Sequence, residues 1–391
     1  MTKDIYITGS GHTCFGRLEQ GLEALIVDAA REALDEAQIP PAEIDAVFLG
    51  HFNSGLVPDG FASSLILQAH PDLRFKPATR CENACASGAA AIHAGMNAIR
   101  AGRARNVLVV GAEKMTHRST PDVTTALAGA GYQNDAAEAG LSFPQLFAVA
   151  AAQYAERYGD PMDAFARIAA KNHENAMKNP LAQMHKALSY EFCREVSEKN
   201  PLIAPPLRLS DCSLVTDGAA AIVLSSGESH AADASARVLM AGAEHVSDFL
   251  PMSRRDFVAF EGPERAIKMA YEAAGITVSD LDFAEVHDCF TPAELLIYEA
   301  MGLAPKGQGA NALSAGTVYA DGRTPVNLSG GLKAKGHPVG ATGVSMHALG
   351  FRQLTGRAGA IQRKGAEWGL AFNMGGAAVA NYATILKADR A

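Results

Sequence analysis

Apolar positions along the chain follow two different periods, and the two alternate. Short, nearly continuous apolar runs predict buried strands, and longer segments with apolar residues at helical spacing predict amphipathic helices. The first strands and helices lie at 4–8, 22–37, 44–50, 87–101, 106–111 and 220–224, with two further helical segments at 143–158 and 162–176. Strands that alternate with helices favour an α/β fold with a mainly parallel sheet covered by helices.

The same order of elements occurs twice. Residues 280–286 repeat the strand pattern of residues 43–49 at a constant offset, and the helix before 275 repeats the small-residue helix before 39. Residues 237–242 likewise repeat the opening strand and the turn expected at Gly9-Ser10-Gly11. A repeat of this length indicates an internal duplication. We therefore predict two similar α/β halves packed together.

One long segment has no counterpart in the second half. We predict an N-terminal half at 1–115 and 210–235, an inserted subdomain at 116–209, and a C-terminal half at 236–391. Because connections this long are usually functional, we expect the insertion to form a lid or ligand-binding subdomain over the active site.

The composition of the chain argues against some classes of binding partner. The formal net charge is −8 and Lys and Arg do not cluster, which argues against nucleic acid or an anionic membrane as partner. Apolar runs stay well short of the ~20 residues of a membrane helix. The first residues lack the pattern of a signal peptide, so we expect a cytosolic protein whose six cysteines are free thiols.

Two common ligand sites are not predicted. Gly9 and Gly11 resemble the start of a dinucleotide-binding fingerprint, but Cys14 stands where its third glycine belongs. His287 and Cys289 have the spacing of two metal ligands, yet the other two ligands are missing, so we expect no metal.

The strongest chemical signal is Cys85 in Ala84-Cys85-Ala86-Ser87-Gly88, where a predicted strand gives way to a helix. Free backbone N–H groups and the helix dipole at such a point favour a thiolate, and small neighbours let a substrate carbonyl approach. Cys85 is therefore a candidate nucleophile. Cys81 lacks this setting and is expected to be structural.

The second half supplies candidate partners for Cys85. His337 opens the helix equivalent to the one after Cys85, and duplication tends to bring equivalent helix ends together, so His337 is the candidate base. Directly after the repeated strand, Cys289 could carry a proton to or from carbon, and His287 could donate a hydrogen bond to a developing oxyanion. A glycine turn at 375–376 could contribute N–H groups.

Taken together, these segments resemble the thiolase superfamily over essentially the whole chain. The resemblance is carried by Ala84–Gly88, Thr216-Asp217-Gly218-Ala219-Ala220, His287-Asp288-Cys289-Phe290, and Gly330-Gly331 with Gly336-His337-Pro338. It implies a five-layer αβαβα fold, acylation of Cys85, activation by His337, and an oxyanion hole made by the N–H groups of Cys85 and Gly375. It also implies a homodimer or homotetramer that uses coenzyme A and acyl-CoA as substrates, binds them with the insertion, and holds no tight cofactor.

Two departures from the commonest thiolases specify the type. They carry Asn-Glu-Ala-Phe where this chain has His287-Asp288-Cys289-Phe290, and a second catalytic Cys where it has Asn373. Both departures resemble the sterol-carrier-protein type and the archaeal acetoacetyl-CoA type, which implies that Cys289 is the acid/base. Residues 78–80 and 211–213 are similar to those of the archaeal enzymes of this type. That similarity implies a complex with two partner proteins, a zinc-ribbon/OB-fold protein and a hydroxymethylglutaryl-CoA synthase.

We therefore predict a thiolase that cleaves or forms 3-ketoacyl-CoA by reversible Claisen chemistry. The motifs leave open a decarboxylating 3-ketoacyl synthase, a retro-aldolase and a catalytically inactive scaffold of the same fold. Residues that contact coenzyme A are not fixed by the pattern. Candidate phosphate contacts are Lys178, Lys186, Arg254 and Arg255, although a solvated surface role is expected for each.

Overall fold

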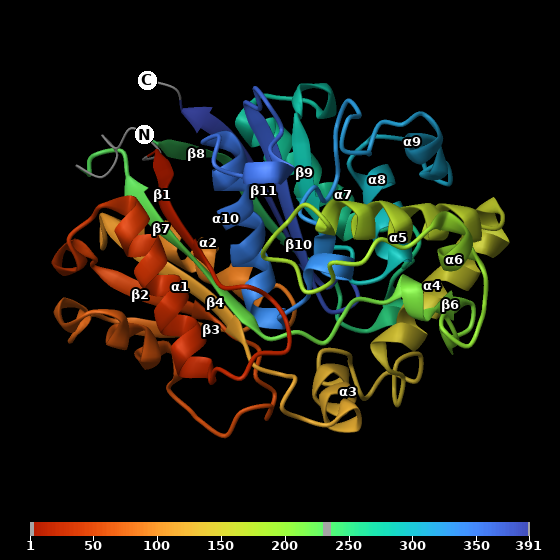
Figure 1. The fold of residues 1–391 in the computed structure, drawn as a ribbon, viewed down its shortest axis with the longest axis horizontal. Helices are drawn as coiled ribbons and strands as arrows, with labels where there is room; N and C mark the ends of the chain where they lie inside the picture. Colours follow the sequence, from red (N-terminus) through yellow and green to blue (C-terminus); the bar gives the residue numbers. More distant parts are fainter. Residues whose placement is uncertain (1–3, 230–235, 390–391) are drawn as a thin grey trace.

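The computed structural model describes residues 4–229 and 236–389. Within these residues the main sheet has nine strands in the order β3-β2-β4-β7-β1-β8-β11-β10-β9 (Figure 1). The strands are β1 (Ile5–His12), β2 (Ala46–Gly50), β3 (Ala78–Cys81), β4 (Asn106–Glu113), β7 (Gly218–Ser226), β8 (Arg237–Ser247), β9 (Phe283–Val286), β10 (Trp368–Gly375) and β11 (Ala380–Asp389).

The order of the strands shows the duplication. Counting outward from the contact between β1 and β8, the first half reads β1-β7-β4-β2 and the second reads β8-β11-β10-β9. The repeated segments, β2 and β9, therefore occupy equivalent places. Residue Val326 bridges β9 on its outer side, as β3 pairs with β2. The predicted duplicated α/β fold is confirmed.

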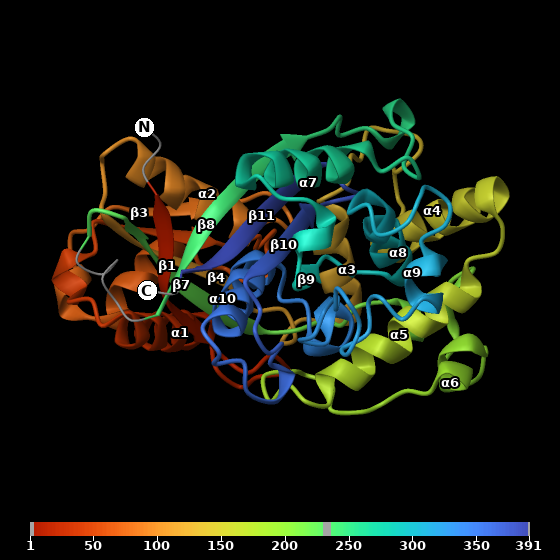
Figure 2. The ribbon, with the colours of Figure 1, turned by 90° about the horizontal axis from the view of Figure 1, so that it is seen from above.

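Helices cover the two halves of the sheet in layers. The helices are α1 (Leu22–Ala37), α2 (Ser87–Arg100), α7 (Glu261–Ala274), α8 (Thr291–Ala300) and α10 (Thr342–Leu354). Helix α10 contacts strands of both halves and also α2, so these two helices form the middle layer (Figures 1 and 2). Helices α1 and α7 pack on the outer faces, against β1, β7 and β4 and against β8 and β11. The result is the expected five-layer arrangement.

The expectation of a mainly parallel sheet was wrong. Only β2 with β3, β2 with β4, and β9 with β10 pair in parallel among the described strands, and the other pairs are antiparallel. The cause is local in the second half, because β11 follows β10 after a turn too short for a crossover. In the first half, the chain returns from the segment after β4 to form β7, and β7 pairs with β4 in the antiparallel direction.

The expected turn at Gly9-Ser10-Gly11 was also wrong, because these residues lie inside β1. A Cβ at Gly9 would lie 2.5 Å from the carbonyl oxygen of Ala33, and one at Gly11 would lie 2.0 Å from that of Ala29. The two glycines therefore let α1 pack directly on the strand. Gly242 has the same role in β8, where a Cβ would lie 2.4 Å from Ala270 O on α7.

The segment between β4 and β7 packs against the second half. Its elements are α3 (Thr120–Ala128), α4 (Phe143–Tyr158), α5 (Met162–Ala176), α6 (Tyr190–Arg194), β5 (Leu202–Ala204) and β6 (Leu207–Arg208). On α5, Lys171 Nζ lies 2.7 Å from Glu294 Oε1 in a fully buried ion pair. Just beyond it, Asn175 Nδ2 donates to Asn327 O and Asn179 Nδ2 to Ser329 O, at 3.0 and 2.9 Å. These contacts join the insertion to the loop that leads to His337.

The boundaries predicted for the halves and the insertion stay predictions, and residues 230–235, next to one of them, lie outside the described residues. Among the residues that the structure does describe, no helix has both the length and the hydropathy needed to cross a membrane.

Candidate active site

Cys85 lies in the tight turn that joins β3 to α2. Ala84 has a φ of 50°, and Ser87 closes the turn by accepting from Asn83 N and donating to Ala84 O at 2.9 and 2.6 Å. The turn holds the half-buried Cys85 beside the start of α2. A Cβ at Gly88 would lie 2.8 Å from Gly340 O, so the start of α2 is packed directly against the segment that opens α10.

This packing brings the candidate residues of both halves into one place. His287 follows β9 and His337 precedes α10, and the ligating atoms of Cys85, His287 and His337 all lie within 4.8 Å of one another. The two imidazole rings are 5.2 Å apart between centroids and nearly perpendicular. Cys85, Cys289 and His337 line one pocket, whose walls are mostly apolar.

The glycine turn after β10 also reaches this pocket. Gly376 lines it, and the backbone N–H of Gly376 lowers the pKa of the Cys85 thiol. Gly375, the residue predicted for the oxyanion hole, is the last residue of β10 and lies directly against Asn83. The turn thus places Gly375 against Asn83, in the turn that carries Cys85, and Gly376 in the wall of the pocket.

Each histidine is held by a polar neighbour. The Nδ1 atom of His337 lies 2.7 Å from the Thr342 hydroxyl, and its backbone N–H donates to the Thr216 hydroxyl at 3.0 Å. The Nδ1 atom of His287 lies 2.9 Å from Nδ2 of Asn373. In both rings Nδ1 is engaged, which leaves Nε2 for the chemistry.

The N–H groups at the start of α2 were expected to favour a thiolate at Cys85, but burial of the thiol has the larger effect on its pKa. Burial raises the pKa of Cys85 to about 12 and outweighs the N–H donors that lower it. Burial, together with the charge of Lys335, lowers the pKa of His337 to about 3. Burial and His337 lower the pKa of His287 as well, and burial raises that of Cys289. At neutral pH the resting site therefore holds neutral thiols and neutral imidazoles, and Cys85 needs a base.

Comparison with known proteins agrees with this geometry. Residues 5–189 match the model of the thiolase N-terminal domain, and residues 243–388 match that of the thiolase C-terminal domain-like family. The chain belongs to the thiolase family. The thiolase resembles the acetyl-CoA acetyltransferase of Methanothermobacter thermautotrophicus, with 37% identity over 96% of this chain and 97% of the relative.

Two further matches define the type and the fold. Sterol carrier protein 2 of Oryctolagus cuniculus is 33% identical over 96% of this chain and 71% of the relative, which confirms the predicted sterol-carrier-protein type. The solved Ltp2-ChsH2(DUF35) aldolase superposes with a TM-score of 0.82 at 22% identity, over 99% of this chain and 98% of the other. At that identity the likeness concerns the fold.

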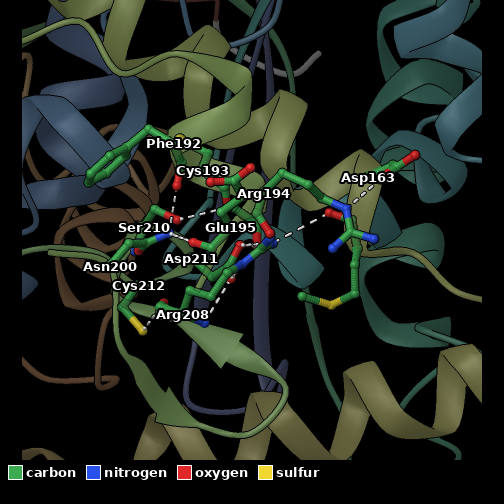
Figure 3. Close-up of polar contacts among 12 residues, drawn as sticks. Asp163, Phe192, Cys193, Arg194, Glu195, Asn200, Arg208, Ser210, Asp211 and Cys212 are labelled. Carbon is green, nitrogen blue, oxygen red and sulfur yellow. Dashed lines mark hydrogen bonds and ion pairs between the residues drawn. The ribbon is translucent and has the colours of Figure 1, made fainter. Parts of the chain in front are cut away.

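In this thiolase the segment between β6 and β7 holds Cys289 in place. The backbone N–H of Ser213 donates to Cys289 O at 2.9 Å, and Cys212 bridges Phe290. The segment that carries Ser213 is fixed by a fully buried ion pair between Arg208 and Asp211, 2.8 Å apart (Figure 3). Asp211 also accepts from the Thr291 hydroxyl at 2.8 Å, which connects the pair to α8.

Asp288, between the two chemical residues His287 and Cys289, was not singled out by sequence reasoning. It is buried and accepts from the backbone N–H groups of Leu332 and Lys333, and from Asn172 Nδ2 at 2.8 Å. Burial and the nearby Glu294 raise its pKa to about 7. The only signal in the sequence was its place inside a motif. Asp288 links α5 of the insertion to the loop before His337.

A second pocket adjoins the first through Ser213, which lines both. Its wall carries several basic side chains, namely His173, Lys186, Lys199 and Lys333. Lys186 and Lys199 are exposed, whereas Lys333 is buried with Nζ on Cys212 O at 2.6 Å. Lys186 was a candidate phosphate contact from the sequence; Lys199 was missed because a lone exposed lysine gives no signal.

The buried pair offers a direct test. We expect Asp211→Ala to lower the free energy of unfolding by about 3–5 kcal/mol, because it leaves Arg208 buried without its carboxylate. The control is Asp163→Ala, which breaks the exposed pair with Arg194 in the same region (Figure 3) and should cost about 0–1 kcal/mol. Urea unfolding of both variants measures the difference, and equal costs would contradict a supporting role for the buried pair.

Proposed function

We propose that this thiolase cleaves and forms 3-ketoacyl-CoA esters through an acyl intermediate on Cys85. The observation that carries the proposal is the close approach of Cys85, His287 and His337, at a pocket that Cys85, His337 and Cys289 line. As a member of its family the chain is an acyltransferase. Acetoacetyl-CoA, made from two molecules of acetyl-CoA, is the first substrate to assay, since the archaeal relative is named an acetyl-CoA acetyltransferase.

In cleavage, His337 accepts the proton of Cys85 while the sulfur attacks the 3-keto carbon. The bond between carbons 2 and 3 then breaks, and its electron pair forms the enolate of acetyl-CoA. Cys289 gives its proton to carbon 2 and releases acetyl-CoA. The thiol of a second coenzyme A attacks the acyl-Cys85 thioester and gives its proton to Cys289. Cys85 leaves as a thiolate and takes back the proton that His337 holds. Condensation is the reverse sequence.

Developing negative charge is stabilised at two places in this scheme. His287 and His337 donate to the oxygen of the enolate once His337 has taken its proton. Backbone N–H groups of Cys85 and of the glycine turn, with Gly375 as the predicted donor, face the oxygen of the acyl intermediate. Apolar walls strengthen both sets of interactions, because water that would screen them is excluded.

The basic second pocket is our candidate site for the phosphates of coenzyme A. Lys186 and Lys199 line it and are exposed, as phosphate-binding ammonium groups need to be. Ser213 lines both this pocket and the one that holds Cys85, so the two pockets adjoin at that residue. The assignment agrees with the expectation that the insertion binds coenzyme A.

The comparisons with known proteins also bear on the alternative functions and on the partners of this protein. Neither a decarboxylating 3-ketoacyl synthase nor an inactive scaffold is favoured by the relatives. A homodimer or homotetramer, a cytoplasmic location and a zinc-ribbon/OB-fold partner remain our proposals; the name of the structural neighbour Ltp2-ChsH2(DUF35) supports looking for a second protein. Co-purification from the native source tests the partner.

Single cysteine variants test the mechanism. With labelled acetyl-CoA, Cys85→Ala should hold no acetyl group, whereas Cys289→Ala should still be acetylated but lose about 10²–10⁴ in carbon–carbon cleavage rate, the usual contribution of a general acid or base. Cys14→Ala, a change at an exposed thiol outside the pocket, is the control. A labelled acetyl group retained by Cys85→Ala would contradict the scheme.

The neutral resting site predicts a flat pH profile. His337 gains a proton only as the pH falls toward about 3, and Cys85 loses its proton only toward about 12. We therefore expect the rate of Cys85 acetylation by acetyl-CoA to vary less than about twofold between pH 6 and 9. Rapid-quench measurements give this rate directly. A loss of rate on acidification through about pH 6.5 would mean that His337 titrates as an ordinary histidine.

The coenzyme A site is tested with a truncated substrate. The double variant Lys186→Ala/Lys199→Ala should raise KM for acetyl-CoA about fivefold and leave kcat unchanged, because each exposed ion pair contributes up to about 1 kcal/mol. Acetyl-pantetheine, which lacks the nucleotide phosphates, should show no difference. Lys268→Ala, on the outer helix α7, is the matched control. An equal effect on both substrates would contradict the assignment.

A further inference from the structure

Asn373 stands where the commonest thiolases have their second catalytic cysteine, and the mechanism above gives it no task. Its side chain is buried, with 1% of its surface exposed, between the two halves of the site. Its Nδ2 atom lies 2.9 Å from Nδ1 of His287 and 3.2 Å from the backbone carbonyl oxygen of Cys85. One amide group therefore contacts both the nucleophile's backbone and a catalytic imidazole.

The orientation of this amide is fixed by its neighbours. A carbonyl oxygen can only accept, so the atom beside Cys85 O must be the NH₂ group and not the amide oxygen. The same NH₂ group faces Nδ1 of His287, and it has a second N–H to give. Nδ1 must therefore accept with its lone pair, and the single proton of the neutral imidazole resides on Nε2.

We propose that Asn373 is a positioning residue that holds His287 in the Nε2–H tautomer. The catalytic meaning of this tautomer rests on the proposed function. With its proton on Nε2, His287 can donate to an enolate oxygen but cannot take the proton of Cys85. The task of base then falls to His337 alone, whose Nδ1 contacts a hydroxyl instead of an amide.

The proposal also connects the two departures of this sequence from the commonest thiolases. A histidine at 287 is ambiguous by itself, because a neutral imidazole can present either a donor or an acceptor to the pocket. The asparagine at 373 removes that ambiguity. Cys289 supplies the thiol that position 373 has given up, so the exchanges at 287, 289 and 373 form one functional set.

The test is ¹⁵N NMR of the full-length protein with selectively ¹⁵N-labelled histidine, which distinguishes protonated from unprotonated ring nitrogens. The His287 signals are assigned by their loss in His287→Gln. In the wild type we expect Nδ1 of His287 to be unprotonated and Nε2 protonated at neutral pH. In Asn373→Asp, which keeps the shape of the side chain but removes both N–H donors, Nδ1 should become protonated because a carboxylate only accepts.

The control is Asn381→Asp, another buried asparagine exchanged for a carboxylate, whose side chain contacts backbone carbonyls instead of His287. It should leave the His287 signals unchanged. A protonated Nδ1 in the wild type overturns the proposal, and that measurement stands even if a variant does not fold. Unchanged His287 signals in folded Asn373→Asp overturn it as well.

Kinetics supply a second readout. Asn373→Leu should slow the carbon–carbon step about 10²–10³-fold, the usual loss for one oxyanion donor, while exchange of acetyl between Cys85 and coenzyme A falls less. Equal losses in both steps would mean a merely structural role and would overturn the proposal. Because the NMR measurement needs no acyl-CoA, lack of thiolase activity with the expected NMR signals would refute the proposed function and not the tautomer.

Discussion

The site depends on the direct backbone contact between the starts of α2 and α10. Glycines on both sides make it feasible, since a Cβ at Gly88 would lie 2.8 Å from Gly340 O and one at Gly343 would lie 2.4 Å from Ala89 N. Glu113 reinforces the contact by accepting from Gly340 N at 3.0 Å. A side chain in this interface would push the halves apart, and Cys85 and His337 would separate with them. Close packing of backbones is thus the condition for every later step of the chemistry.

The site works with little net charge. Burial keeps both thiols protonated and both imidazoles neutral, so proton positions are set by hydrogen bonds instead of by solution pH. Charged groups surround the site without entering the pocket, as in the ion pairs of Lys171 with Glu294 and Arg208 with Asp211. They fix loops, and the neutral groups perform the transfer. Negative charge that develops on a carbonyl oxygen of the substrate would then meet hydrogen-bond donors for which no bulk water competes.

Much of this could be predicted from the sequence because duplication repeats a pattern at a distance. The bounds of α1, α4 and α5 were predicted correctly, and the equivalence of the two helix starts predicted that Cys85 and His337 lie together. Strand direction could not be predicted, since the pattern of a buried strand is the same in either sense. The raised pKa of Cys85 could not be predicted, because a helix start is visible in the sequence whereas the depth of burial is not. The contacts of Asp288 and Asn373 join residues far apart in the chain, and spacing carries no information about them.

The mirrored strand order has a consequence for how such a site arises. Two identical copies meeting about a two-fold axis would present the same side chain from each side, two thiols or two imidazoles. Fusion into one chain removes that restriction, because each copy then mutates on its own. Here the first copy has the sulfur of Cys85 at its helix start and the second has the imidazole of His337. A nearly symmetric scaffold therefore supports an asymmetric reaction. Cutting the polypeptide just before β8 would separate the two halves. Each fragment would then carry only one member of the proton-transfer pair, Cys85 or His337.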